Sequence, residues 1–298
     1  KDFCYLPFNN KNILETLDKF YQYKICKQID IPCPDFQNVL KVKDLALVNK
    51  LKFPILVKPT KRKDLETKVF RNLYLDNYQD FEKNLVIIKK FISQGIGFIF
   101  TEFIPGDDTN IYAYTCFRSN EGEILNFWTG KKLNQYPNVF GVFSSASNSA
   151  PLIIEKHGYK LVQALKGYGI IQPEFKFDFR DGKYKLMETN MRSMMWHRTG
   201  CISGVKLMET QYLYGSNKPI KKYIQNKKDI VHFIFMIHEI SNLIARKGYF
   251  KFFKKNLFGQ EKLYWAIYDK KDIKPFLFSF IISIKSYLKA CLNLLDIN

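Results

Sequence analysis

The stretch PEFKFDFRDGKYKLMETNMR, residues 173–192, decides the fold of this chain. Polar and aromatic residues alternate over residues 174–179, a turn pair follows at Asp181-Gly182, and a second run extends through residues 186–192. Two such runs around a glycine turn predict an antiparallel β-hairpin. We expect a three-residue loop, residues 180–182, with Gly182 in the left-handed position.

This hairpin gathers acidic and amide side chains on one face. Because strand side chains alternate between faces, Glu188, Asn190 and Arg192 share one side of their strand. A three-residue loop makes Glu174 the cross-strand partner of Glu188 and adds it to the group. Two carboxylates and an amide beside a guanidinium suit Mg²⁺ that carries a nucleotide phosphate. A half-exposed hairpin whose acids are merely solvated stays open as the alternative, since charged outer faces are common on antiparallel sheets.

The composition predicts a folded and strongly basic protein. The chain has 298 residues, 46% of them apolar, which excludes a mainly disordered state. Its formal net charge of +19 predicts attraction to anions, which include nucleotides, acidic substrates, anionic membranes and nucleic acid. Charge alone does not choose among these partners.

The cysteine pattern and the apolar runs bear on location. Six scattered cysteines without a C-x-x-C pair predict reduced thiols in a cytoplasmic protein, rather than a disulfide framework or a zinc site. No apolar run reaches the length of a bilayer span, and the longest, residues 276–284, is interrupted by Lys285. We expect at most a weak contact of the C-terminal tail with an anionic membrane.

Several nucleotide and metal motifs are absent from the sequence. It contains no G-x-x-x-x-G-K-[ST] loop, no G-x-G-x-x-G after a strand and no H-E-x-x-H pair, which excludes P-loop, dinucleotide-binding and zincin sites. Of the four histidines, His197 is the most interesting because it follows the acidic strand closely, although its neighbours Met194, Met195 and Trp196 suit a core equally well.

Helices and strands are mixed along the chain. The expected helices cover residues 19–29, 76–93, 151–166 and 229–246, and the expected strands cover residues 54–59, 68–73, 98–101, 110–117 and 123–129. This order predicts an α+β or α/β protein with lobes built around antiparallel sheets. After Gly215 the sequence changes to Lys-rich, mainly helical segments.

A strand end in the middle of the chain has the form of a hinge between lobes. The backbone of Glu102, Phe103 and Ile104 is suited to read an adenine edge, with an apolar side chain packed on the ring. Asp107 or Asp108 is placed to accept a ribose hydroxyl. Ordinary strand-end structure is the alternative.

Lys58 ends a different predicted strand, just before a proline. A lysine at that position can meet a phosphate, because a buried lysine without a partner would be costly. Ordinary strand-end structure is again the alternative.

In this order, the segments resemble the ATP-grasp superfamily, and most closely its carboxylate–amine ligases, a branch often described as ATP-dependent carboligases. Each segment is weak alone, but their order and spacing are specific. The resemblance covers about residues 17–215 and rests on residues 17–19, 29–34, 53–59, 102–108, 135–137, 174–176 and 188–192. It implies an α+β fold of two lobes whose antiparallel sheets enclose ATP.

The resemblance also implies a role for each matched residue. By this resemblance, Lys19 and Lys58 contact the phosphates, Glu102, Phe103 and Ile104 form the adenine hinge, and Asp107 or Asp108 lies near the ribose. The resemblance also implies that Glu174, Glu188 and Asn190 bind Mg²⁺ (alternatively Mn²⁺) and that Arg192 binds an anion.

The implied chemistry is the attack of a carboxylate on the γ-phosphate of ATP, followed by displacement of phosphate by an amine. Cationic groups and a metal must offset the repulsion between two anions. We therefore expect small-molecule carboxylate and amine (or thiol) substrates, with Arg192, Lys58 and Arg118 catalytic. Arg118, Lys131 and Lys132 are candidates to hold the substrate carboxylate, with a solvated basic face as the alternative. Oligomeric state is not predicted.

The sequence departs from the family pattern in three places. The loop over the phosphates is usually glycine-rich, but residues 60–67 contain no glycine, so Lys61, Arg62 or Lys68 is expected to supply charge there. Met191 stands where proline is common. The family normally has an α/β domain before Lys19, of which we expect only a remnant in a trimmed chain.

These expectations give four segments and leave two other functions open. The segments are a remnant at 1–18, a small lobe at 19–104, a large lobe at 105–215 and a mainly helical extension at 216–298. A basic protein that binds single-stranded nucleic acid is one alternative to the ligase. An ATP-grasp relative that has lost catalysis and serves as a binding module is the other.

Overall fold

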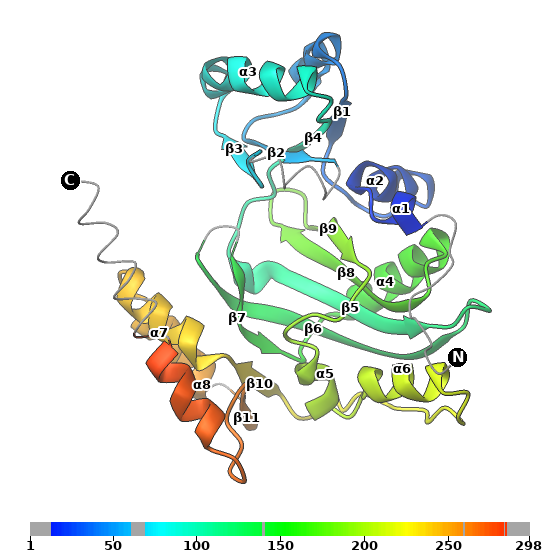
Figure 1. Cartoon of the computed structure of the whole chain (residues 1–298), viewed down its shortest axis with the longest axis vertical. Coiled ribbons are helices and arrows are strands. Elements are labelled where there is room, and N and C mark those ends of the chain that lie inside the picture. The colour runs from blue at the N-terminus through cyan, green and yellow to red at the C-terminus, as the bar shows by residue number, and fades with distance from the viewer. Residues whose placement is uncertain (1–12, 61–68, 139–140, 259, 283, 285–298) are drawn as a thin grey trace.

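The computed structural model describes residues 13–60, 69–138, 141–258, 260–282 and 284. They form two lobes, each built on its own β-sheet, with the smaller lobe above the larger one in Figure 1. The α+β class with two sheet-based lobes is therefore as expected from the sequence. In the described part, no helix is both long and apolar enough to span a bilayer.

The smaller lobe is a four-stranded antiparallel sheet. Its strands, in sheet order, are β1 (Phe36–Val39), β4 (Phe98–Glu102), β2 (Ile55–Pro59) and β3 (Leu73–Leu75). Helix α3 (Tyr78–Ser93) packs on this sheet through a buried apolar stripe, together with the 3₁₀ helix η1 (Val42–Lys50). Helix α3 begins after Asn77, whose side chain accepts a hydrogen bond from the Asp80 amide (3.0 Å).

The expected strand at 68–73 is displaced in the structure. The strand β3 covers residues 73–75, and Lys68 lies outside the described residues. Residues 73–75 pair with residues 55–57 of β2, and this pairing across the sheet sets the position of β3.

The larger lobe is a seven-stranded sheet that is antiparallel except at one edge. In sheet order its strands are β11 (Lys262–Trp265), β10 (Val231–Ile234), β7 (Val142–Ser147), β6 (Ile124–Tyr136), β5 (Ile111–Arg118), β8 (Gly169–Asp178) and β9 (Lys183–Asn190). Only β10 and β11 run parallel. The sequence did not predict β7, and β6 extends seven residues beyond its expected end.

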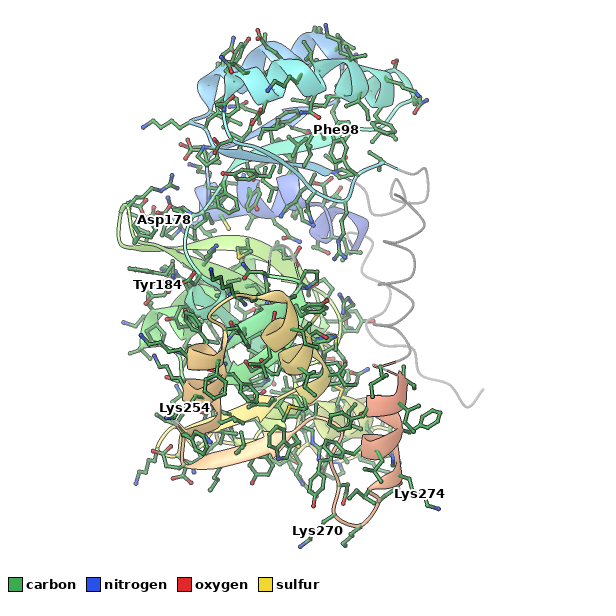
Figure 2. The ribbon with its side chains drawn as sticks, turned by 90° about the vertical axis from the view of Figure 1, so that its left-hand side faces the viewer. Phe98, Asp178, Tyr184, Lys254, Lys270 and Lys274 are labelled. Atoms are coloured by element: carbon green, nitrogen blue, oxygen red, sulfur yellow. The ribbon has the colours of Figure 1, made fainter. Side chains whose placement is uncertain are left out.

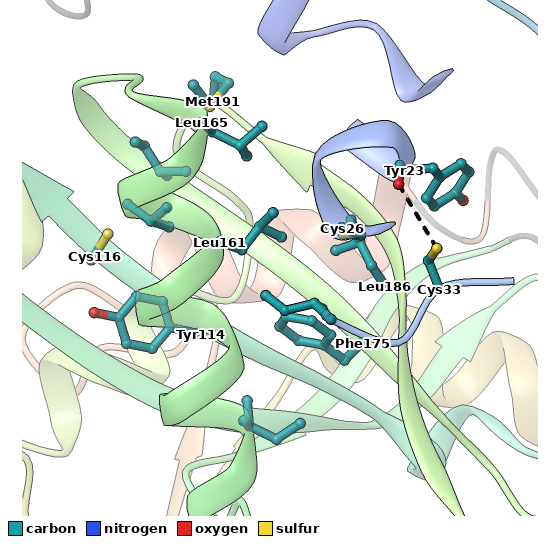
Figure 3. Close-up of a cluster of buried hydrophobic side chains, with 14 of the residues drawn as sticks. Tyr23, Cys26, Cys33, Tyr114, Cys116, Leu161, Leu165, Phe175, Leu186 and Met191 are labelled. Carbon is teal, nitrogen blue, oxygen red and sulfur yellow. Dashed lines mark hydrogen bonds between the residues drawn. The ribbon is translucent and has the colours of Figure 1, made fainter. Parts of the chain in front are cut away.

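Helices α4 (Leu152–Leu165) and α2 (Lys19–Gln28) cover one face of the larger sheet. Their apolar side chains join those of β5, β8 and β9 in one core, which Figure 3 shows in close-up. Gly158 lets α4 approach β5 closely, because a Cβ there would lie 2.2 Å from the Cβ of Tyr114. Helix α2 packs against the larger lobe, and its Phe20 and Tyr23 also contact Phe36 of β1 in the smaller lobe.

Helices α5 (Arg198–Ile202) and α6 (Leu207–Gly215) cover the opposite face. Trp128, Trp196 and Phe233 lie in the core between these helices and the sheet. The short helices α1 (Ile13–Thr16) and η3 (Asp108–Asn110) complete this part of the chain. Four cysteines fall within the described residues, and all are free thiols: Cys26, Cys33 and Cys116 are buried and Cys201 is exposed.

The prediction of a single helix at residues 229–246 is wrong. Residues 231–234 form β10, and only Met236–Ala245 are helical, as α7. All four residues of β10 are buried and paired between β7 and β11. A short apolar run suits a strand as well as a helix, and here the pairing with the sheet decides for the strand. With α8 (Phe250–Phe258), the extension after residue 215 thus holds helices and two strands of the main sheet.

Candidate functional site

A cavity of about 1090 Å³ lies between the two lobes and is lined by residues of both sheets. It brings together residues that are up to about 170 positions apart in the sequence. The residues expected at a nucleotide and metal site that line it are Lys19, Lys58, Glu102, Phe103, Ile104, Asp107, Glu174, Glu188, Asn190 and Arg192.

The hairpin of β8 and β9 forms one wall of this cavity. Glu174 and Glu188 are cross-strand partners, which confirms the expected pairing. The loop, however, has four residues, because Asp178 pairs with Lys183. The register shifts between Phe175 and Glu174, where Met187 of β9 is left without a partner. This one extra residue compensates for the longer loop, so that Glu174 and Glu188 still lie opposite each other. Gly182 has φ +68°, the left-handed conformation that was expected.

Helix α2 places Lys19 against this hairpin. The Asp18 side chain caps the helix by accepting hydrogen bonds from the amides of Phe20 (2.7 Å) and Tyr21 (3.2 Å). Gln22 exchanges hydrogen bonds with the backbone of Thr189 in β9, at 2.8 and 3.2 Å. As a result, Lys19 Nζ lies 3.3 Å from Glu188 Oε2 at the first turn of the helix.

The two carboxylates have opposite electrostatic environments. Burial raises the pKa of Glu174, which is 5% exposed, and Glu188 raises it further, although Lys132 and Arg192 oppose this shift. Burial acts on Glu188 as well, but the charges of Lys19 and Lys58 outweigh it and lower the pKa of that carboxyl. Glu188 therefore presents an ionised carboxylate, whereas Glu174 is stabilised in its ionised form by a cation nearby.

Glu174 makes no salt bridge with any described residue, and a buried carboxylate without a paired charge is costly. The amide of Asn190 lies between the two acids, with Nδ2 at 3.5 Å from Glu174 Oε1 and 3.4 Å from Glu188 Oε1. Both distances are long, and rotation of the amide would present its oxygen instead. Two carboxylates and an amide oxygen fit the ligand preference of Mg²⁺. Within the described residues, no cluster of three or more His, Cys, Asp or Glu side chains forms a metal site.

Lys58 is the cation that the smaller lobe directs at these acids. Burial, together with the neighbouring charges of Lys19 and Arg71, lowers its pKa to about 8, against the opposing effect of the two glutamates. The cavity thus concentrates positive charge opposite the acidic hairpin, as an anionic phosphate chain requires.

The hinge segment leaves one backbone donor free. The Phe103 amide donates to the Pro54 carbonyl (2.9 Å), and the Phe103 carbonyl accepts from Arg180 Nη2 (3.3 Å). The Ile104 amide has no hydrogen-bond partner among the described residues. Lys176 lies over the Phe103 ring, 5.3 Å from its centroid. The backbone donor that remains for an adenine edge is therefore that of Ile104.

Arg118 does not belong to this site, contrary to our expectation. Its Nε donates to Gln163 Oε1 and its Nη1 to the Gly167 carbonyl, both at 3.0 Å, and it does not line the cavity. Arg118 thus ties β5 to the end of α4. Of the neighbouring lysines, Lys132 lines the cavity and Lys131, on the other face of β6, does not.

Other positions complete the comparison with the sequence. Lys61, Arg62 and Lys68 lie outside the described residues, as does the side chain of Asp108. Arg71 and Lys176 line the cavity but were not singled out as such from the sequence. Alternation along β8 is a signal for Lys176, since it lies two residues beyond Glu174, whereas Arg71 has no local signal.

Comparison with known proteins identifies the fold. No protein-family model matches the chain. An ADP complex of N5-carboxyaminoimidazole ribonucleotide synthetase superposes on 72% of this chain and 55% of its own, with a TM-score of 0.56 at 14% sequence identity. This chain has the ATP-grasp fold. L-Amino acid ligase from Bacillus licheniformis matches 70% of the ATP-grasp chain and 51% of its own, with a TM-score of 0.52 at 18% identity.

One curated relative is similar in sequence. D-aspartate ligase of Enterococcus faecium (strain Aus0004) is 24% identical over 207 residues, which are 62% of the ATP-grasp chain and 47% of the relative. The chain therefore spans about half the length of the relatives that it matches.

Proposed function

We propose that this chain is an ATP- and Mg²⁺-dependent ligase that joins a carboxylate to an amine. The observation that carries the proposal is the pairing of Glu174 with Glu188 across the hairpin, opposite Lys19 and Lys58 in one cavity. The three relatives are all named as ligases or synthetases, and one of them was solved with ADP.

In such a ligase, the γ-phosphoryl group of ATP passes to the substrate carboxylate, which gives an acylphosphate and ADP, and the amine then displaces phosphate. A bound Mg²⁺ neutralises phosphate charge and aligns the phosphate chain. Glu174, Glu188 and the Asn190 amide oxygen would hold that ion.

The remaining residues of the cavity bind and orient the anions. Lys19 and Lys58 face the phosphates from α2 and β2, and the Ile104 amide is the donor for the adenine edge. We assign the substrate carboxylate to Arg192 and Lys132, which line the cavity beside Glu174 and lower its pKa. Because they offset the repulsion between carboxylate and phosphate, they favour attack.

Isothermal titration of the chain with ATP tests the metal assignment. We expect binding that depends on Mg²⁺, and Glu188→Ala should weaken it at least about 100-fold, since changing even an outer partner of a metal ligand costs 10–100-fold. The control is Glu82→Ala, which removes an exposed carboxylate on α3. Unchanged binding of Mg²⁺-ATP by Glu188→Ala would refute the assignment.

A screen for ADP release against amino acids and uronic acids, each with an amine acceptor, tests the reaction. Release that depends on both substrates supports the ligase. ATP binding without turnover across a broad panel supports a relative that has lost catalysis. Affinity for single-stranded nucleic acid that falls steeply with salt, without ATP binding, supports the nucleic-acid alternative.

A further inference from the structure

A buried chain of hydrogen bonds runs from His197, at the start of α5, to Glu174 on the same face of the larger sheet. Gln172 lies two residues before Glu174 on β8, so both side chains are on the same face of the strand. Gln172 Nε2 donates to Glu174 Oε1 at 2.7 Å. On its other side, Gln172 Oε1 lies 2.6 Å from His197 Nε2 and accepts from Thr115 Oγ1 at 3.0 Å.

These partners fix the orientation of the Gln172 amide. Two donors converge on its oxygen, so its nitrogen must face Glu174, and rotation of the amide would place two oxygens against each other. Gln172 and Thr115 are fully buried, so water cannot replace a lost partner without opening the core.

His197 is held in the tautomer that this chain needs. Its Nδ1 accepts from the Met194 amide at 3.4 Å, so the ring proton is on Nε2, directed at Gln172. Trp128 packs edge-on against the ring, with the centroids 6.2 Å apart. Burial lowers the pKa of His197 to about 3, so the ring is a neutral donor throughout the physiological range.

The two carboxylate oxygens of Glu174 therefore differ in their hydrogen bonding. Glu174 Oε1 receives Gln172, whereas no described residue donates to Oε2, and the side chain lines the cavity. A ligating carboxylate whose second oxygen is tied to the protein loses less conformational freedom when it binds a metal.

We propose that His197 is a positioning residue for the metal site: through Gln172 it sets the rotamer of Glu174 before the cation arrives. This inference rests on the proposed function, because it needs a divalent cation at Glu174. His197 does not line the cavity, so it acts through Gln172 and not on substrate.

The test measures Mg²⁺ affinity separately from nucleotide affinity. The full chain is titrated with Mg²⁺ at saturating ATP, and ATP binding is measured in EDTA. His197→Phe keeps the ring but removes the donor, and we expect a 10–100-fold weaker Mg²⁺ affinity with unchanged binding of metal-free ATP. His197→Gln, whose amide nitrogen can take the place of Nε2, should restore most of the affinity.

His232→Phe is the matched control. His232, on β10, is buried to a similar degree but is hydrogen-bonded to the Asn256 carbonyl and does not line the cavity, so its replacement should leave Mg²⁺ affinity unchanged. Equal Mg²⁺ affinity in wild type and His197→Phe would overturn the proposal, as would a parallel loss of metal-free ATP binding. Failure of the wild type to bind ATP in a Mg²⁺-dependent manner would instead refute the proposed function itself.

Discussion

Lys58 carries a positive charge into a cavity that disfavours it. Burial and two neighbouring cations lower its pKa to about 8, so the unliganded side chain begins to lose its proton near that pH. A phosphate beside it favours the ammonium form. In a chain that binds ATP as we propose, nucleotide binding near pH 8 should therefore be coupled to proton uptake at Lys58.

We expect ATP affinity to be flat up to about pH 7.5 and to fall by up to about tenfold per pH unit above pH 8. Titration calorimetry in two buffers of different ionisation enthalpy, at pH 8 to 9, measures the proton uptake. Lys58→Arg keeps the charge at all these pH values and should remove the dependence. An equal pH dependence in wild type and Lys58→Arg would show that another group titrates.

At the scale of elements, the turn between β8 and β9 is stabilised by a buried carboxylate. Asp178, which Figure 2 labels near the junction of the two lobes, has a fully buried side chain that accepts from Arg180 (2.7 Å) and Lys185 (2.7 Å). These bonds, foremost that from Arg180, hold the pKa of Asp178 far below its ordinary value. Since Arg180 also donates to the Phe103 carbonyl, the turn is tied to the hinge.

Asp178→Asn should lower the free energy of unfolding by about 2–3 kcal/mol at pH 7, because it removes the charge from a buried acceptor but leaves partly exposed cations that water can solvate. The folded pKa lies below the unfolded value, so this stabilisation is present above about pH 4 and is lost as the pH falls further. Urea unfolding at pH 7 and pH 3 measures it, and the gap between variant and wild type should narrow at pH 3.

Asp181→Asn is the control within the same turn. Its carboxylate pairs with Lys185 at 2.8 Å but is 38% exposed, so we expect a loss of at most about 1 kcal/mol. Similar losses in the two variants would contradict the role given to burial.

At the scale of the whole molecule, an exposed apolar helix lies far from the cavity. Residues 274–282 are helical, and the side chains of Leu277, Phe278, Ile281 and Ile282 are 49–61% exposed. Lys270 and Lys274 lie at its start, at the lower end of the molecule in Figure 2. Apolar side chains beside lysines match an anionic lipid surface, and we propose that this helix contacts one.

The protein should then sediment with vesicles that contain phosphatidylserine and not with pure phosphatidylcholine. Each of the three lysines at residues 270, 271 and 274 should contribute about 1 kcal/mol to binding of the anionic surface. Together they predict an affinity roughly 100-fold higher for vesicles with phosphatidylserine than for vesicles without it, and salt should reduce this difference. Phe278→Asp combined with Ile282→Asp should abolish binding. Ile224→Asp, at a position 83% exposed elsewhere, should not. Protein that stays in the supernatant with anionic vesicles at low salt would refute the contact.

The sequence by itself determined the local elements and the identity of the acids on the hairpin. Capping by Asp18, the glycine turn at Gly182 and alternation along residues 183–192 act over a few residues, so they can be read without the fold. Their order along the chain was enough to indicate the two-lobed architecture.

Only the tertiary structure decided which distant groups meet. The pairing of residues 231–234 as a strand and the position of Arg118 outside the site both depend on partners far along the chain. The same holds for the hydrogen bonds that link His197 to Glu174. Such contacts leave no periodic trace in the sequence, because their energy comes from burial and pairing that exist only once the sheets are assembled.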